Sequence, residues 1–148
     1  ILDEPTTGLD PAVRHLLWGK VNQLKAEGKT VLLTTHYMHE AEVLCDRLVI
    51  VNEGRVIAEG TPTQLRDQHT PGFVAAFDKS AAERAAPAAR ERGFHVLEDS
   101  SGLYVRAPLL AQLLDFQDQN GLTALQLRPA HLEDVFLKLT GQELTSNA

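Results

Sequence analysis

Cysteine is nearly absent from this chain, since Cys45 is the only one among 148 residues. A single cysteine excludes an intramolecular disulfide and is typical of a protein from a reducing compartment. The sequence also lacks an apolar run as long as a membrane-spanning helix, and no signal-peptide pattern opens it. Its formal net charge of −6 leaves no broad basic face for nucleic acid. We therefore expect neither a nucleic-acid partner nor direct insertion into a membrane.

The chain opens on two adjacent carboxylates, Asp3 and Glu4, at the end of a short apolar run. Neighbouring residues of a strand point to opposite faces, so these two acids need not repel each other across one site. Adjacent carboxylates at the mouth of a strand suit a division in which one helps to hold a divalent metal and the other orients a water. An acidic turn after an ordinary strand fits the same two residues, because short motifs often match by accident.

A strand, a helix and a second strand are predicted next. Asp10 reads as an N-cap followed by proline in the first helical position. Apolar residues then recur at helical spacing as far as Gly28, where a left-handed residue is usual. Residues 30–35 form an almost continuous apolar and β-branched run, the pattern of a buried parallel strand, and His36 follows. Glu4 and His36 are thus predicted at the C-terminal strand ends, the edge where open α/β sheets bind ligands.

These elements, in this order and spacing, resemble the second half of an ABC-transporter ATPase domain. The resemblance implies that Asp3 helps to hold Mg²⁺ through its water shell and that Glu4 is the catalytic carboxylate of ATP hydrolysis. It implies that Asp10 lies in a D-loop, which in that family crosses a dimer interface toward the partner's nucleotide. It also implies that His36 is the switch histidine that contacts the γ-phosphate. The implied catalytic residues are Glu4 and His36, the implied nucleotide-binding residues are Asp3, Asp10 and His36, and the implied cofactors are ATP and Mg²⁺.

Two other interpretations of His36 stay open at this point. A lone histidine at a strand end is often a structural hydrogen-bonding residue, although Glu4 on the neighbouring strand favours the phosphate-sensing role. His36, His39 and Glu40 also suggest metal ligation, since positions three apart share a helix face. Their order matches neither of the common zinc-helix patterns, and the sequence shows no further ligand cluster, so a transition-metal site is disfavoured.

The continuation of the chain agrees with the ATPase resemblance. Residues 37–45 suit a short helix, and residues 47–51 and 55–58, joined by a glycine-containing turn, read as a hairpin. Thr61 is an N-cap candidate, with proline after it and Gln64 three positions on, which predicts a further helix. The hairpin resembles the closing strands of the ABC ATPase domain.

The composition changes near residue 78. The alanine-rich residues 78–93 fit either a linker or a solvated helix interrupted at Pro87. His95 and His131, further on, are expected to be surface or capping residues rather than ligands. Beyond the alanine-rich segment the patterns predict a hairpin of residues 94–97 and 103–106, a helix over 108–120, a strand over 122–127 and a helix over 129–140.

The last predicted helix carries a second resemblance. The apolar residues Leu132, Val135 and Leu139 share one face, which by itself indicates only a packed core. Residues 128–141 as a whole closely resemble the C-terminal tail of export-type ABC ATPase subunits, the group that includes the daunorubicin-resistance and nodulation-factor exporters.

Several parts of a complete ATPase are absent from the sequence. It contains no Gly-x-x-x-x-Gly-Lys-Ser/Thr loop to hold the β- and γ-phosphates, and neither the signature sequence nor the Q-loop of the ABC family. We therefore expect the isolated chain to be inactive as an ATPase. Because no initiator methionine precedes Ile1, we expect it to be the back end of a longer protein.

The sequence thus predicts an α/β fold: the C-terminal part of a P-loop NTPase domain of the ABC type, with parallel strands and a closing hairpin, followed by a small α+β unit. The expected bounds are residues 1–77 for the ATPase part, 78–93 for a linker or helix and 94–148 for the accessory unit.

The expected function is that of the ATP-binding subunit of an ABC exporter, which couples ATP hydrolysis to the export of a drug-like, lipid or saccharide substrate. Its expected partners are a second ATPase subunit and a membrane permease, which would hold it, as a cytoplasmic subunit, on the inner face of the plasma membrane. Two other classes stay open: a non-transport ABC ATPase, such as a translation or repair factor, and a non-catalytic regulatory remnant. The export-type tail and the lack of a second ATPase-like segment argue against the former.

Overall fold

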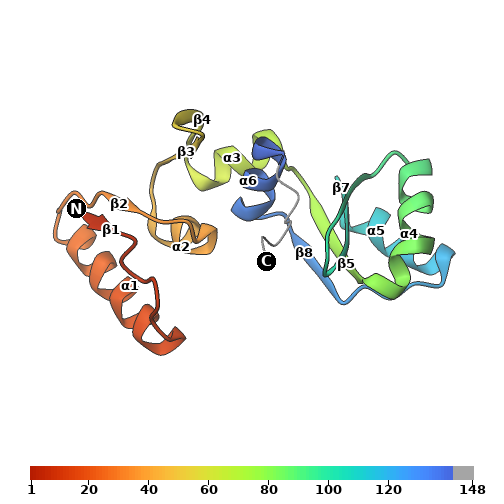
Figure 1. Ribbon diagram of the computed structural model, residues 1–148, viewed down its shortest axis with the longest axis horizontal. Helices are drawn as coiled ribbons and strands as arrows, with labels where there is room; N and C mark the ends of the chain where they lie inside the picture. The colour runs from red at the N-terminus through yellow and green to blue at the C-terminus, as the bar shows by residue number, and fades with distance from the viewer. Residues whose placement is uncertain (142–148) are drawn as a thin grey trace.

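The computed structural model describes residues 1–141 as an elongated α/β molecule, with the N-terminal elements at one end and a four-stranded sheet at the other (Figure 1). No helix in this described range is long and apolar enough to cross a membrane. The elements, in chain order, are β1 (Leu2–Asp3), α1 (Pro11–Ala26), β2 (Leu33–Thr34), α2 (Met38–Leu44), β3 (Leu48–Asn52), β4 (Arg55–Gly60), α3 (Pro62–His69), β5 (Phe73–Asp78), α4 (Lys79–Glu91), β6 (His95–Glu98), β7 (Gly102–Ala107), α5 (Leu110–Asn120), β8 (Gln126–Pro129) and α6 (Leu132–Thr140).

The N-terminal end contains the predicted pair of parallel strands. Leu2 pairs with Leu33 and Asp3 with Thr34, which confirms the parallel arrangement. The second strand is shorter than the predicted residues 30–35, because β1 offers only two residues to pair with. Helix α1 lies between the strands in sequence, and a small cluster of buried side chains holds it to α2: Trp18, Val21 and Leu44.

The predicted hairpin and the helix after it are confirmed. Strands β3 and β4 pair antiparallel, and α3 begins at the predicted capping box. In that box the Thr61 hydroxyl accepts a hydrogen bond from the Gln64 amide at 3.1 Å, and the Gln64 side chain accepts one from the Thr61 amide at 3.0 Å. This reciprocal pairing satisfies donors that a helix start would otherwise leave free.

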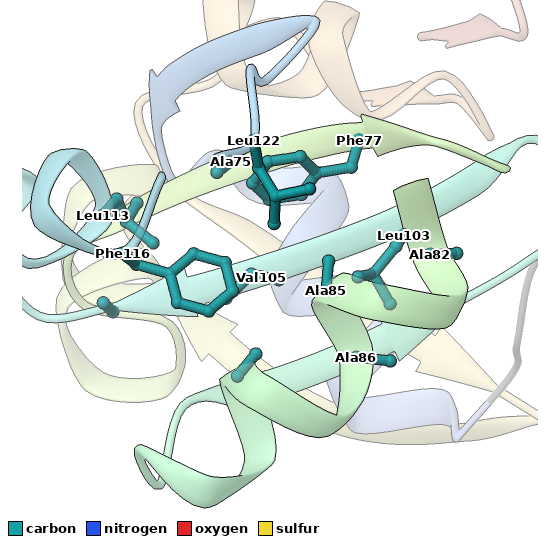
Figure 2. Packing of buried hydrophobic residues seen from close by; sticks show 12 residues of the cluster. Ala75, Phe77, Ala82, Ala85, Ala86, Leu103, Val105, Leu113, Phe116 and Leu122 are labelled. Atoms are coloured by element: carbon teal, nitrogen blue, oxygen red, sulfur yellow. The ribbon is translucent and has the colours of Figure 1, made fainter. Parts of the chain in front are cut away.

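The other end of the molecule is an antiparallel sheet of order β6-β7-β5-β8. Helices α4 and α5 cover one face of it, and Figure 2 shows the side chains buried between them. The central strand β5 was not predicted, because alanines at its middle positions have little strand propensity. The buried residues of this core are Ala75, Phe77, Ala82, Ala85, Ala86, Ala89, Leu103, Val105, Ala107, Leu113, Phe116 and Leu122.

The alanine-rich segment forms helix α4, which continues through Pro87. Asp78 caps it, with its carboxylate accepting a hydrogen bond from the Ala81 amide at 2.8 Å. Alanines at helical spacing give it a narrow buried face, so its backbone can approach the sheet closely.

The strand predicted over residues 122–127 is present but displaced, because β8 starts four residues later than predicted. Residues before β8 form a loop in which Leu122 packs into the core and the Ala124 amide donates to the Gln117 side-chain oxygen at 2.6 Å. The strand itself starts at Gln126, opposite Ala76 of β5.

The last two helices begin later than predicted. Helix α5 starts at Leu110 rather than residue 108, and α6 at Leu132 rather than residue 129. The second delay has a clear cause, because Arg128 and Pro129 are still paired with β5. The expected accessory unit, residues 94–148, extends beyond the described residues.

Helix α6 brings the end of the described chain back to its first half. Its side chains Leu132 and Val135 are buried together with Ala41, Ile50 and Leu65 from α2, β3 and α3. Figure 1 shows α6 beside α3, on the side of the sheet away from α4 and α5. This helix therefore links the ATPase-like elements to the four-stranded sheet.

Candidate functional site

The ends of the two parallel strands bring Glu4 and His36 together. The Glu4 Oε1 atom lies 3.0 Å from the His36 Nδ1 atom, although the two residues are 32 positions apart in sequence. Both side chains are open to solvent, with 46% of Glu4 and 71% of His36 exposed. A carboxylate and an imidazole thus stand side by side where an incoming ligand can reach both.

Thr34 fixes the two acids that end the first strand. Its hydroxyl donates to Asp3 Oδ1, and it accepts a hydrogen bond from the Glu4 amide at 3.2 Å. The Glu4 amide also donates to the Thr34 carbonyl oxygen at 2.9 Å. The pairing of β1 with β2 therefore holds Asp3 and Glu4 through the same threonine, a role that no local sequence pattern indicates.

The backbone of Glu4 is in an uncommon conformation. Its φ of 42° lies in the left-handed region, which few non-glycine residues occupy. Such a conformation costs on the order of 1–3 kcal/mol and persists only where the surroundings hold it, often at functional sites. Here the two hydrogen bonds to Thr34 hold the Glu4 amide in place.

Asp10 lies apart from this group. Its Oδ1 atom accepts a hydrogen bond from the Val13 amide at 3.0 Å, so it is the N-cap of α1 that the sequence predicted. The structure places it with neither Glu4 nor His36 among its hydrogen-bond partners in the described residues. Its nucleotide-binding role therefore stays a hypothesis.

The acids at the strand end fit a magnesium ion that also binds water and substrate phosphates better than a metal held by protein side chains alone. Within residues 1–141 no group of three or more His, Cys, Asp or Glu side chains is arranged to hold a metal. Mg²⁺ commonly keeps several waters and takes only one or two carboxylates together with substrate phosphates. The exposed Asp3 carboxylate, with one oxygen bonded to Thr34, fits that partial role.

A buried glutamate that the sequence analysis considered only as a metal ligand lies behind the site. Glu40 is completely buried, and the Trp18 indole donates to its Oε1 atom at 2.9 Å. Burial by itself raises the pKa of Glu40, but the neighbouring hydroxyls of Thr6 and Thr35, the hydrogen bond from Trp18 and the charge of Arg14 outweigh it, so the pKa lies below its usual value. One carboxylate thus joins the segments that follow β1 and β2.

The pattern around Glu40 could have indicated this role. Glu40, Ala41 and Leu44 are the buried residues of α2, so the acid lies on the apolar face of its helix. Its neighbour His39 packs edge-on against the Trp18 ring, with centroids 5.6 Å apart. His39 and Glu40 thus both contribute to the packing of α1 against α2. An acidic residue on the apolar face of a helix is the sequence signal that could have indicated this role for Glu40.

Comparison with known proteins finds similarity to ATP-binding proteins of export systems. Residues 81–141 match the family model described as the nodulation factor export protein NodI, C-terminal domain. The Nod factor export ATP-binding protein I of Mesorhizobium japonicum is 45% identical over 97% of this chain and 42% of its own length. The protein of the same description from Cupriavidus pinatubonensis is 47% identical over 97% of this chain and 44% of its own length.

A solved structure described as the ATP-binding subunit of an ABC transporter also matches. It is 46% identical, with 45% of this chain and 28% of that chain covered and a TM-score of 0.41. The chain spans less than half the length of the curated relatives named above.

Proposed function

We propose that this chain, which is similar to Nod factor export ATP-binding proteins, forms the C-terminal, catalytic-carboxylate part of the ATP-binding subunit of an ABC exporter. The observation that carries the proposal is the contact of Glu4 Oε1 with His36 Nδ1, 3.0 Å apart at the ends of two paired parallel strands. In the whole subunit these residues would act in the hydrolysis of ATP.

In this proposal the two ring nitrogens of His36 have different tasks. A carboxylate only accepts hydrogen bonds, so Nδ1 carries the hydrogen in its contact with Glu4. Nε2 is then left to face the γ-phosphate, to which it donates when the ring is protonated. Glu4, held by His36, accepts a hydrogen bond from the attacking water and orients it.

Asp3 would complete the site by holding Mg²⁺ through water. The metal, when bound, neutralises charge on the β- and γ-phosphate oxygens. Thr34 holds Asp3 Oδ1 by a hydrogen bond, which leaves the other carboxylate oxygen for the metal's water shell. The phosphate loop, absent from this sequence, would have to come from elsewhere in the subunit, so we expect the chain alone to be inactive.

The same proposal assigns partners. Two subunits would close on ATP, with Asp10 in the segment that crosses toward the partner's nucleotide, and the pair would dock on a membrane permease from the cytoplasmic side. Differential affinity of ATP for the closed state would drive the cycle. The relatives are named for Nod factor export, which supports an export function over the translation or repair alternative, with a drug-like, lipid or saccharide compound as the proposed substrate. The division into residues 1–77, 78–93 and 94–148 stays part of this proposal.

Steady-state ATP hydrolysis by the whole subunit tests the proposal. We expect His36→Ala to lower kcat by at least about 100-fold, the range of a positioned acid or base, with ATP binding retained. His69→Ala, at the end of α3, is the matched control and keeps the wild-type rate. A His36→Ala subunit that hydrolyses ATP at the wild-type rate would remove His36 from the reaction.

A further inference from the structure

The second face of the four-stranded sheet carries a row of basic side chains. Along this row His95 of β6 lies opposite Arg106 of β7, Arg106 opposite Val74 of β5, and Val74 opposite Arg128 of β8. Residues directly opposite each other in antiparallel strands project from the same face, with Cβ atoms about 5 Å apart. His95, Arg106 and Arg128 therefore share the face that α4 and α5 leave uncovered.

Helix α6 lies against this face of the sheet and adds a further cation to it. Asp134, Leu137, Lys138 and Gly141 recur at the spacing of one helix face. These residues, together with side chains of the sheet, line a pocket of about 260 Å³. The pocket is therefore built jointly by β6, β7, β5 and α6.

The positive charges that line this pocket are not fully neutralised by the carboxylate that lines it. The one acid that lines it within the described range, Asp134, accepts two hydrogen bonds from Arg128, at 2.7 and 3.1 Å, and one from the His131 amide at 2.8 Å. Arg106 is half-buried, and no hydrogen bond or ion pair to it is recorded among residues 1–141. Lys138 donates to the His69 carbonyl oxygen, which carries no full charge. Arg106 and Lys138 thus face a carboxylate that Arg128 already neutralises.

Burial makes this imbalance costly for the chain alone. Burial lowers the pKa of Arg106, and the charge of Asp134 only partly offsets it. Burial and the charges of Arg106 and Lys138 together lower the pKa of His95, so its ring adds a neutral hydrogen-bonding group. A desolvated cation whose charge is only partly compensated is unfavourable, and an additional anion corrects this.

The remaining walls are apolar or aromatic. Leu97 and Tyr104 lie opposite each other on the same sheet face, two residues along the strands from His95 and Arg106. Leu137 of α6 lines the pocket beside Lys138. A ligand with an apolar body as well as an anionic head would contact both kinds of wall.

We propose that this pocket binds a small organic anion, with a carboxylate or phosphate head held by Arg106 and Lys138 and an apolar body against Leu97 and Leu137. The site lies on the sheet and α6, not at the strand ends that carry Glu4 and His36. It does not depend on the ATPase assignment. A ligand there would tie α6 to the sheet, and α6 also packs on α2 and α3.

Titration of the isotope-labelled 148-residue chain with phenylacetate, phenyl phosphate and inorganic phosphate, followed by NMR, tests the proposal. We expect saturable shifts at the amides of Leu97 and Arg106 with at least one of the two phenyl compounds, and the preferred compound identifies the head group. Arg106→Gln should weaken that binding by at least 10-fold, about 1.4 kcal/mol. Arg84→Gln, on the exposed face of α4, is the matched control and should bind as the wild type does.

Thermal stability separates a binding role from a structural one. Without ligand, Arg106→Gln should melt at the wild-type temperature or above it, because it removes an unpaired half-buried charge. Lys138→Gln gives a second weakened variant. The proposal is overturned if neither phenyl compound shifts these amides, if Arg106→Gln binds as tightly as the wild type, or if inorganic phosphate binds as tightly as phenyl phosphate.

Discussion

Glu40 connects the two segments that carry the candidate catalytic residues. It bonds Trp18 of α1, and the hydroxyls of Thr6 and Thr35 lower its pKa. Thr6 follows Glu4 by two positions and Thr35 precedes His36, so the ionised Glu40 carboxylate stabilises both neighbourhoods. A buried acid with several donors keeps its charge, because hydrogen bonds to the charged form outweigh desolvation.

Glu40→Gln tests this residue through the pH dependence of stability. The folded pKa of Glu40 lies below its usual 4.5, so its contribution is present above pH 4.5 and is lost as pH falls through the folded pKa. We expect the substitution to cost about 1 kcal/mol of unfolding free energy at neutral pH, the difference between charged and neutral hydrogen bonds. This cost should shrink as pH falls below 4.5.

The unfolding can be followed by the fluorescence of Trp18, the only tryptophan. Glu83→Gln, on the exposed side of α4, is the control and should show no such pH-dependent difference. A cost for Glu40→Gln that stays constant with pH would mean that the Glu40 charge does not stabilise the fold.

Local sequence patterns single out candidate site residues, whose roles in hydrolysis stay predictions. Asp3, Glu4 and His36 stand out because each ends an apolar run, and the structure brings Glu4 and His36 into contact. The roles of Thr34 and Glu40 were missed, because their partners lie 31 and 22 positions away and no local pattern connects them. Distant pairing is the information that composition and periodicity lack.

At the scale of elements, α4 is helical in spite of one proline. Pro87 lies inside it, where proline lacks the amide hydrogen that would bond to the carbonyl oxygen four residues earlier. The buried alanines Ala82, Ala85 and Ala89 supply both high helix propensity and a close contact with the sheet. Tertiary packing therefore outweighs the penalty of one proline.

Replacing that proline should stabilise the protein. We expect Pro87→Ala to raise the free energy of unfolding by about 2 kcal/mol, because alanine restores a hydrogen bond and suits the helix interior. Pro62→Ala, in the first turn of α3, is the matched control and should be neutral or slightly destabilising, since proline fits that position. Chemical denaturation measures the free energy of unfolding of both variants. Equal changes in that free energy would show that the position of the proline in the helix does not matter.

Element boundaries were predicted where sequence signals are strong. Asp10 and Thr61 correctly marked the starts of α1 and α3. Strand β5 was not predicted, because Ala75 and Ala76 at its middle favour a helix over a strand. Its contacts with β7, β8 and α4 form only when the chain folds. The strand predicted to start at residue 122 starts instead at Gln126, because Leu122 packs into the core from the preceding loop.

At the scale of the whole molecule, the two ends differ in how much they bury. The cluster under the four-stranded sheet has twelve buried residues, and the cluster between α1 and α2 has three. Several apolar side chains of the N-terminal half are exposed, including Leu16 at 74%, Leu32 at 61% and Val56 at 60%. Exposed apolar residues of this kind are typical of surfaces that other segments cover.

Amide hydrogen exchange should reveal this difference. In the chain alone, we expect amides of β5 and β7 to exchange at least about 100-fold more slowly than the Glu4 amide, because local opening tracks local burial. The Glu4 amide is bonded to the Thr34 carbonyl oxygen at 2.9 Å, so rapid exchange there would report opening of the β1 and β2 pair. Equal protection at both ends would instead show that the molecule unfolds as one cooperative unit.

The identity of the nucleotide retained by a Glu4→Gln subunit tests the central claim most directly. The whole subunit is incubated with Mg²⁺ and ATP, separated from free nucleotide, and its bound ATP and ADP are quantified beside the wild type and Glu83→Gln. We predict that Glu4→Gln retains intact ATP and hydrolyses it at least about 100-fold more slowly, while Glu83→Gln behaves as the wild type does. Turnover of ATP by Glu4→Gln at the wild-type rate would contradict the assignment of Glu4 as the catalytic carboxylate.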